Sequence, residues 1–287
     1  SAVVLVVGLT SEGVDPPDEA EGHDRTSLLL PLNQDALIAR VAAAAAEQRL
    51  AVAVVVMSGG PVDLTQVKAD PNVGAILWCG YPGQSGGAAI ADALFGNTNP
   101  SGKLTMTWYD EGFAKAVSLT DMGMRPNATT GNPGRSHRFY TGTPVFAFGE
   151  GLSYTAFDVE PPAVMLTEPA LAVVRRDAQG TRAQSAVVGH ATVRVTNVGK
   201  RSGAASIILY AAPPPSTAAS GAPRHMVVDF GKVLLEAGES AKLAFDIRSR
   251  DLTYADSSGR RVTSAGAWRF WTGKATDGND AVAVMLE

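Results

Sequence analysis

The sequence predicts an α/β half followed by an all-β half, because the pattern of apolar residues changes along the chain. Up to about residue 158, uninterrupted apolar runs alternate with segments of helical spacing, which is typical of an open α/β sandwich with a largely parallel sheet. Beyond Pro161-Pro162 the apolar runs are short and alternate with polar residues, as in an antiparallel β-sandwich. The length of 287 residues is about twice the ~150 of one domain. We therefore expect two domains, at residues 1–158 and 159–287.

The first half contains three predicted strands and two predicted helices. Each strand is a continuous apolar run: Ala2–Val7, Ala51–Met57 and Val73–Trp78. Apolar residues three and four apart predict a helix over Gln34–Arg49, with Asn33 as its side-chain cap. A second helix is predicted through Ala88–Leu94, and Gly96 is expected to end it.

The second half consists of short predicted strands separated by turn residues. The strands are expected at Ala191–Val195, Ala205–Tyr210, Val227–Leu235, Ala241–Ile247 and Ala267–Trp271. The segment Ala211–Ala222 is rich in proline, alanine and serine, so we expect it to be a long exposed loop.

Composition excludes several classes of function. Lys and Arg total 24 against 28 Asp and Glu, and a net charge of −4 gives no global attraction to nucleic acid or to an anionic membrane. No apolar run reaches the ~18 residues of a membrane span. The single cysteine, Cys79, excludes an intrachain disulfide and a cysteine-rich metal site. None of the four histidines is spaced as a metal pair, so we expect neither metal nor cofactor.

Three segments follow the ends of predicted parallel strands, where ligands bind in open α/β sheets: Leu9–Arg25, Ser58–Asp63 and Cys79–Gly87. The third is glycine-rich but lacks the Lys-Ser/Thr pair of a nucleotide-binding loop. It also holds Gly83-Gln-Ser85-Gly-Gly87, the spacing of a nucleophile elbow. Ser85 lies six residues beyond Cys79 rather than on the strand-to-helix turn, and a triad would need His137 or His190. A serine hydrolase remains an alternative.

The segment 15–25 concentrates five carboxylates. It could be a solvated acidic loop or a calcium site, although its spacing does not fit an EF-hand. It could also serve general acid catalysis, since clustered carboxylates disfavour one another's ionised forms and one can stay protonated near neutral pH. The residues alone leave these three options open.

The segment Asn127-Ala-Thr129 is an N-glycosylation sequon, which predicts a surface loop if the protein is secreted.

Several motifs, in this order along the chain, resemble the carboxy-terminal part of glycoside hydrolase family 3. They are Glu19-x-Glu21-Gly-x-Asp24-Arg25, Val56-Met-Ser-Gly-Gly-Pro61, Gly80-Tyr-Pro-Gly-Gln84, Leu94-Phe-Gly96-x-x-Asn99-Pro-x-Gly-Lys103 and Phe148-Gly-x-Gly-Leu-Ser-Tyr154. The stretch from Met124 to Gly142 is specifically similar to plant β-D-xylosidases, some of which also release α-L-arabinofuranose. The second half resembles the family's fibronectin type III-like domain. One departure is Leu32, which stands where relatives usually carry glycine.

The resemblance implies a retaining mechanism with two carboxylates. The nucleophile is an aspartate on a preceding barrel domain, which these residues do not contain. The general acid/base corresponds to Glu19, while Glu21 and Arg25 would tune its pKa and contact the sugar. The expected function is therefore the C-terminal fragment, or second chain, of an exo-acting β-xylosidase that acts on xylo-oligosaccharides or arabinoxylan-derived substrates.

The same resemblance implies a secreted protein of the extracellular space or cell wall, glycosylated at Asn127, whose partner is the N-terminal barrel of the same enzyme. A non-catalytic carbohydrate-binding or structural module is a further alternative to the enzyme. Because the family's α/β domain has further strands and helices upstream, we expect an apolar surface beside Ala2–Val7 that another polypeptide covers.

Overall fold

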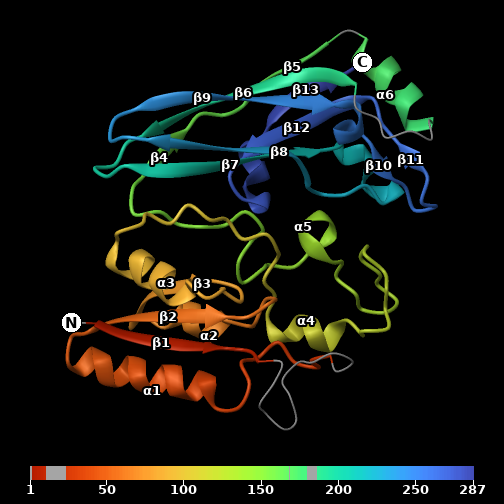
Figure 1. Ribbon diagram of the computed structural model, residues 1–287. Coiled ribbons are helices and arrows are strands. Elements are labelled where there is room, and N and C mark those ends of the chain that lie inside the picture. The colour runs from red at the N-terminus through yellow and green to blue at the C-terminus, as the bar shows by residue number, and fades with distance from the viewer. Residues whose placement is uncertain (1, 11–23, 168, 180–185) are drawn as a thin grey trace.

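The computed structural model describes residues 2–10, 24–167, 169–179 and 186–287, which form an α/β layer beneath a β-sandwich (Figure 1). The α/β half has a parallel sheet in the order β1-β2-β3, made of β1 (Ala2–Gly8), β2 (Ala51–Met57) and β3 (Val73–Trp78). These bounds match the predicted strands to within one residue. The α/β-plus-sandwich fold class is therefore confirmed.

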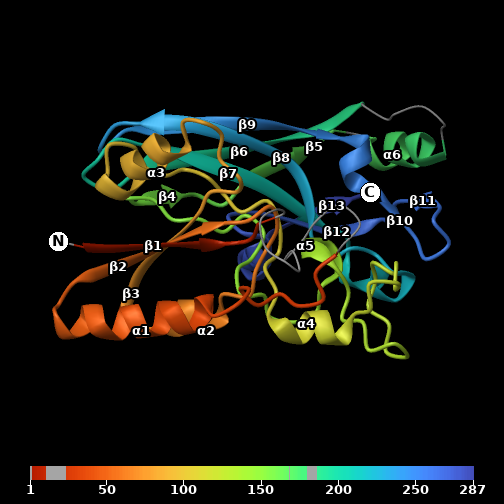
Figure 2. The same cartoon turned by 60° about the horizontal axis from the view of Figure 1, so that its bottom comes forward.

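Helices cover the sheet because their apolar faces need burial. The helices of this half are α1 (Gln34–Glu47), α2 (Thr65–Ala69), α3 (Gly86–Phe95), α4 (Glu111–Ala116) and α5 (Ser136–Phe139). Figure 2 shows α1 and α2 on one face of the sheet and α3 on the other. Ile38 and Ala42 of α1 are almost completely buried against the sheet, together with Val54 of β2.

One predicted helix cap is confirmed and the other is wrong. Gly96 ends α3 in the left-handed region, at φ 77°. Asn33 precedes α1, but its side chain makes no capping hydrogen bond. Its backbone lies at φ −107° and ψ 23°, outside the extended region that places a capping oxygen over the first helical N–H groups. Gln34 instead exchanges two side-chain hydrogen bonds with the backbone of Gly8, at 2.8 and 2.9 Å.

The sandwich consists of two four-stranded antiparallel sheets. Its strands are β4 (Phe157–Val159), β5 (Ala163–Leu166), β6 (Val187–Asn197), β7 (Gly203–Ala212), β8 (Met226–Leu235), β9 (Ser240–Arg248), β12 (Gly266–Thr272) and β13 (Val282–Leu286). One sheet has the order β13-β12-β7-β8, and in the other β4, β5 and β9 all pair with β6. Trp268, Phe270 and Leu209 fill the space between the sheets. A short pair, β10 (Tyr254–Ala255) and β11 (Arg261–Val262), and helix α6 (Ala170–Gln179) flank it.

The expected domain boundary and the expected loop over Ala211–Ala222 both differ from the structure. The expected boundary between residues 158 and 159 falls inside β4, which pairs with β6 of the sandwich. The prediction of an exposed loop over Ala211–Ala222 is wrong at its start, since Ala211 and Ala212 are buried in β7 and pair with β12. Residues Pro215–Ser220 form a 3-10 helix. Small residues suit a crowded strand end as well as a loop, and local composition does not separate the two.

The two halves are held together by hydrogen bonds and aromatic packing. The backbone N–H of Ala275 donates to the carbonyl oxygen of Phe148 at 2.9 Å, and Arg201 donates to the carbonyl of Gly96 at 2.7 Å. The Phe148 ring meets the buried Tyr210 edge-on at 6.3 Å between centroids. Gly149 has φ 83°, and a Cβ there would lie 2.3 Å from the Tyr210 hydroxyl, so this junction requires glycine.

Candidate active site

The carboxyl ends of β1, β2 and β3 meet at one edge of the sheet, on the right in Figure 1. The chain remains bonded to its neighbour strands as it leaves the sheet: the N–H of Leu9 donates to Met57 O at 2.9 Å, and that of Cys79 donates to Val56 O at 3.1 Å. The loops that follow the three strands therefore begin side by side, as their sequence positions predict.

Glu19 and Glu21, the expected acid/base and its neighbour, lie outside the described residues. The flanks of their segment are described, and both lie at the carboxyl edge. On one flank, Gly8 and Leu9 are bonded to Gln34 and Met57. On the other, Arg25 Nη2 donates to the carbonyl oxygen of Pro61 at 3.1 Å. The guanidinium of Arg25 thus ties the acidic segment to the loop after β2.

That loop has a buried polar support. Ser58 is fully buried, and its hydroxyl donates to Gly60 O at 2.7 Å. The indole N–H of Trp78 lies 3.0 Å from Ser58 O and 3.2 Å from Ser58 Oγ. Trp78 in turn packs edge-on against the buried Trp108 at 5.8 Å. These bonds hold the backbone of residues 58–60 rigidly at the sheet edge.

Glu111 is a structural anchor that the sequence analysis missed. Its carboxylate oxygen Oε2 accepts hydrogen bonds from Ser27 Oγ at 3.0 Å and from the N–H of Leu28 at 2.7 Å. Its own N–H donates to Asp63 Oδ2 at 2.8 Å, and the N–H of Asp63 donates to Leu28 O. Residues 27–28 are thereby joined to both the loop after β2 and the start of α4. Glu111 lies more than 80 positions from Ser27, so no local spacing could reveal the pair.

An aromatic side chain borders the same edge. Tyr81 follows β3 in the Gly80-Tyr-Pro-Gly turn and its side chain is 54% exposed. A Cβ added at Gly59 would lie 2.9 Å from the Tyr81 ring, so the ring lies directly against that glycine. Gly59 thus allows this close approach, whereas Gly80 is required for its left-handed backbone at φ 62°.

Burial affects two titratable groups near this edge. It raises the pKa of the Asp35 carboxyl, with a smaller contribution from the negative charge of Asp63. Burial also raises the pKa of the Cys79 thiol, whose sulfur lies 3.5 Å from Val56 O. A thiol with a raised pKa is a poor nucleophile, which favours a packing role for Cys79.

The geometry does not support the serine hydrolase alternative. Ser85 occupies the first position before α3, and its side chain is exposed. His190 lies in β6 of the sandwich, 3.1 Å from Asp246, while the ring of His137 packs on Phe148 at 4.2 Å. Within the described ranges, no hydrogen bond joins Ser85 to a histidine.

Asn127, the predicted glycosylation site, lies in an exposed loop. Its Oδ1 accepts from the N–H of Thr129 at 2.9 Å, and its own N–H donates to Asn132 O. Among the residues that the structure describes, no group of His, Cys, Asp and Glu is arranged to hold a metal. In the same residues, no helix is both long enough and apolar enough to cross a membrane.

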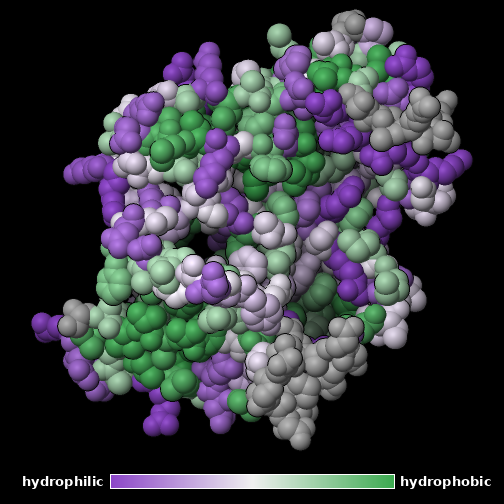
Figure 3. All heavy atoms as spheres, in the orientation of Figure 1, coloured by the Kyte–Doolittle hydropathy of each residue, from purple (hydrophilic) through white to green (hydrophobic). Residues whose placement is uncertain are grey.

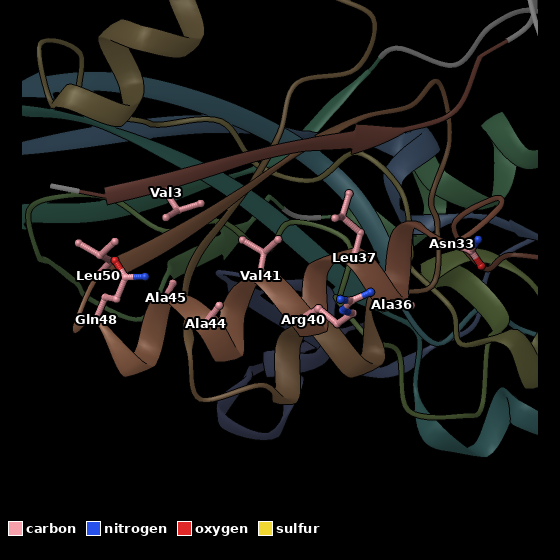
Figure 4. A pocket seen from close by; sticks show the side chains of 10 residues that line it. All are labelled: Val3, Asn33, Ala36, Leu37, Arg40, Val41, Ala44, Ala45, Gln48 and Leu50. Carbon is pink, nitrogen blue, oxygen red and sulfur yellow. The ribbon is translucent and has the colours of Figure 1, made fainter.

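A groove lies away from the loop edge, along α1 and beside β1 (Figure 4). Its lining is mainly aliphatic and includes Val3, Leu37, Val41 and Leu50. Within the described part of the chain β1 pairs only with β2, so its other edge carries no strand.

Comparisons with known proteins identify both halves. Residues 1–154 match the glycosyl hydrolase family 3 C-terminal domain, and residues 206–276 match a fibronectin type III-like domain. The chain is 40% identical over 280 residues to beta-D-xylosidase 3 of Arabidopsis thaliana. This alignment covers 92% of this chain and 35% of the relative. It is 38% identical to a beta-xylosidase/alpha-L-arabinofuranosidase 2 of Medicago sativa subsp. varia, over 92% of this chain and 34% of that protein.

Solved structures give the same result. A GH3 exo-beta-xylosidase in complex with a xylobiose aziridine activity-based probe superposes with a TM-score of 0.82 and 31% identity, over 100% of this chain and 36% of the other. A beta-D-glucoside glucohydrolase from Trichoderma reesei gives a TM-score of 0.73 and 28% identity, over 98% and 39% of the two chains. The chain thus spans about a third of the length of the relatives that it matches.

Proposed function

Because the chain belongs to glycoside hydrolase family 3, we propose that it supplies the general acid/base half of a retaining exo-acting β-xylosidase. Its substrates would be xylo-oligosaccharides, cleaved from the non-reducing end, with release of α-L-arabinofuranose as a second activity. The nucleophilic aspartate would come from a barrel domain in the remaining two thirds of the protein. The observation that carries the proposal is the anchoring of both described flanks of the Glu19 segment at the carboxyl edge of the sheet.

In this proposal Glu19 protonates the leaving oxygen and then activates the water that releases the sugar. A retaining pair needs its two carboxyl groups about 5–5.5 Å apart, so the segment must hold Glu19 firmly. The Arg25–Pro61 and Glu111–Leu28 hydrogen bonds, which fix the described residues after this segment, support such positioning. Glu21 and Arg25 would contact the sugar or tune the acidity of Glu19.

Variants of Glu19 in the full-length enzyme test the assignment. Glu19→Gln should abolish hydrolysis of xylobiose, because its leaving group, a sugar hydroxyl, must be protonated to depart. Hydrolysis of an activated aryl β-xyloside should fall less, because its phenolate leaves without protonation. Added azide should partly restore turnover of the activated substrate by Glu19→Ala. Ser85→Ala is the matched control and should retain activity. Absence of azide rescue, or loss of activity in Ser85→Ala, would contradict the proposal.

The relatives' remaining two thirds would also cover surface on this chain. The side chains of Val4 and Val6 on β1 are 46% and 60% exposed, and the aliphatic groove beside α1 adjoins the same strand. We assign this apolar surface to contact with the N-terminal part of the same protein. A non-catalytic module would instead leave it free, and the purified protein would then contain no barrel.

Secretion to the extracellular space or cell wall is part of the same proposal. Support comes from the exposed position of Asn127 in its sequon. The full-length protein expressed in a eukaryotic secretory host should lose glycan mass on treatment with an amidase that removes N-linked glycans. Asn127→Gln should remove that site, and an unchanged glycan mass in the variant would contradict glycosylation there.

A further inference from the structure

A group of arginines lies where α5 meets the sandwich, away from the acid/base segment. Arg125 donates to the carbonyl oxygens of Ala255, at 2.6 Å, and Gly221, at 2.8 Å. In the β10–β11 pair, Ala255 lies opposite Arg261. Arg125 and Arg138 both lie over the ring of Phe139, at 5.0 and 5.8 Å from its centroid. Arg125, Arg138 and Arg261, here called the arginine cluster, therefore converge on one place.

Two of the three side chains are already occupied by backbone or hydroxyl partners. Arg125 is held by the carbonyls just named, and Arg261 Nε donates to Thr253 Oγ1 at 2.6 Å. Arg138 differs, because its guanidinium makes no hydrogen bond to any described residue and its Nε is buried without a partner. It is also absent from every ion pair formed within the described ranges.

The surroundings of Arg138 are positively charged. Burial lowers its pKa, and the charges of Arg261 and Arg125 lower it further. The adjacent His137 is kept neutral for similar reasons, first by burial and then by the charges of Arg138 and His225. Among the described residues, the causes of both shifts are burial and positive charges. A half-buried cation among like charges is costly unless an anion compensates it.

We propose that the arginine cluster is a binding site for a carboxylate, with Arg138 as its principal donor. A guanidinium presents paired N–H groups that match the two oxygens of a carboxylate. Arg261 is exposed and Arg138 only partly buried, so the place is open to a ligand. Figure 1 shows α5, β10 and β11 on the same side of the molecule as the carboxyl ends of β1 and β2, and Figure 3 shows hydrophilic residues gathered there.

Two sources could supply this carboxylate: a uronic acid unit of an oligosaccharide, or an aspartate or glutamate from the rest of the full-length protein. Calorimetric titration of the full-length protein with D-glucuronate, and with D-glucose as the neutral control, separates them. If the carboxylate comes from a sugar, the wild-type protein should bind glucuronate and not glucose. The affinity for glucuronate should then fall at least tenfold in Arg138→Met. The methionine keeps the aliphatic packing on Phe139 and removes the charge. Arg194→Met is the matched control, since Arg194 of β6 is 45% exposed and its ion pair with Glu160, at 3.7 Å, is a surface pair that contributes little.

A protein source predicts a different result. Wild-type protein would not bind glucuronate, and Arg138→Met would lower the Tm because it leaves the partner carboxylate unpaired. Arg194→Met would leave the Tm unchanged. The proposal is overturned if glucuronate binding survives in Arg138→Met. It is also overturned if the wild type does not bind glucuronate and Arg138→Met leaves the Tm unchanged or raises it, as expected for an uncompensated charge.

Discussion

His137 shows how strongly the domain junction changes a single side chain. Its ring packs on Phe148, and its carbonyl oxygen accepts from His225 Nδ1 at 2.6 Å. Burial, followed by the charges of Arg138 and His225, lowers the pKa of His137 to about 4. The imidazole is therefore neutral in the folded protein at every pH near neutrality.

The His137 pKa gives the chain an acid-sensitive stability. Since the folded pKa lies below the unfolded value of 6.5, the contribution is complete above pH 6.5 and is lost as the pH falls to about 4. The loss amounts to about 3 kcal/mol at ~1.4 kcal/mol per pKa unit. Urea unfolding at pH 7 and pH 4.5 should show a smaller pH dependence in His137→Phe than in wild type. Equal pH dependence in wild type and His137→Phe would contradict the assignment.

Gly149 tests the junction by steric exclusion. Gly149→Ala should destabilise the protein by at least ~2 kcal/mol, because the residue is left-handed and its new Cβ would meet Tyr210 and Gly273. Gly87→Ala makes the same chemical change inside α3 with no atom within 4 Å, and should be neutral or stabilising by up to ~1 kcal/mol. Thermal unfolding measures both, and similar Tm values for the two variants would show that the junction tolerates a side chain.

At the scale of elements, the parallel sheet is unequally buried. β2 lies between β1 and β3, and Val54 at its centre is fully buried. β1 alternates, with Val7 buried and Val4 and Val6 largely exposed. Residues at the centre of the sheet should therefore contribute more to the free energy of unfolding than the exposed side chains of β1.

Two valine-to-alanine variants measure that difference. Val54→Ala leaves a cavity in the core and should reduce the free energy of unfolding by about 2 kcal/mol. Val4→Ala removes the same atoms from an exposed site of the neighbouring strand and should cost less than ~0.5 kcal/mol in this chain. Urea denaturation of the two variants at one pH tests the comparison. Equal losses would mean that the β1 face is buried in solution.

At the scale of the whole molecule, the proposed partner makes a prediction about this chain alone. With Val4, Val6 and the groove beside α1 uncovered, the chain without the rest of the protein should bind a hydrophobic dye and self-associate. It should also fail to hydrolyse an aryl β-xyloside, because one of the two carboxylates is missing. Sedimentation and an activity assay decide both points. A monodisperse 29.7 kDa particle that binds no dye, or one that is active, would contradict the proposal.

Val6→Lys provides the matching test in the full-length protein. The side chain is exposed in this chain, so the substitution should leave the fold of the α/β half intact. If β1 contacts the N-terminal part, the buried charge should weaken that contact and lower the Tm of the full-length enzyme. Glu47→Ala, at an exposed position of α1 that does not line the groove, should lower it less.

The sequence by itself determined the two-layer fold, the three parallel strands, the end of α3 at Gly96 and the family. These features depend on local periodicity, on single backbone conformations or on short motifs, all of which neighbouring residues specify. Leu32 shows where this kind of prediction ends. The sequence marks Leu32 as a departure from the usual glycine, but only the structure shows that its backbone is left-handed, at φ 56°.

Only the tertiary structure decided the capping of α1, the burial of Ala211 and Ala212, the anchoring role of Glu111 and the convergence of Arg125, Arg138 and Arg261. Each depends on contacts between residues that are far apart in the chain. Such contacts form only when the helices, strands and loops pack, and the burial and charge that shift the pKa of His137 arise at the same moment. Local sequence patterns do not predict these long-range contacts, because the same residues in another packing arrangement would have different neighbours.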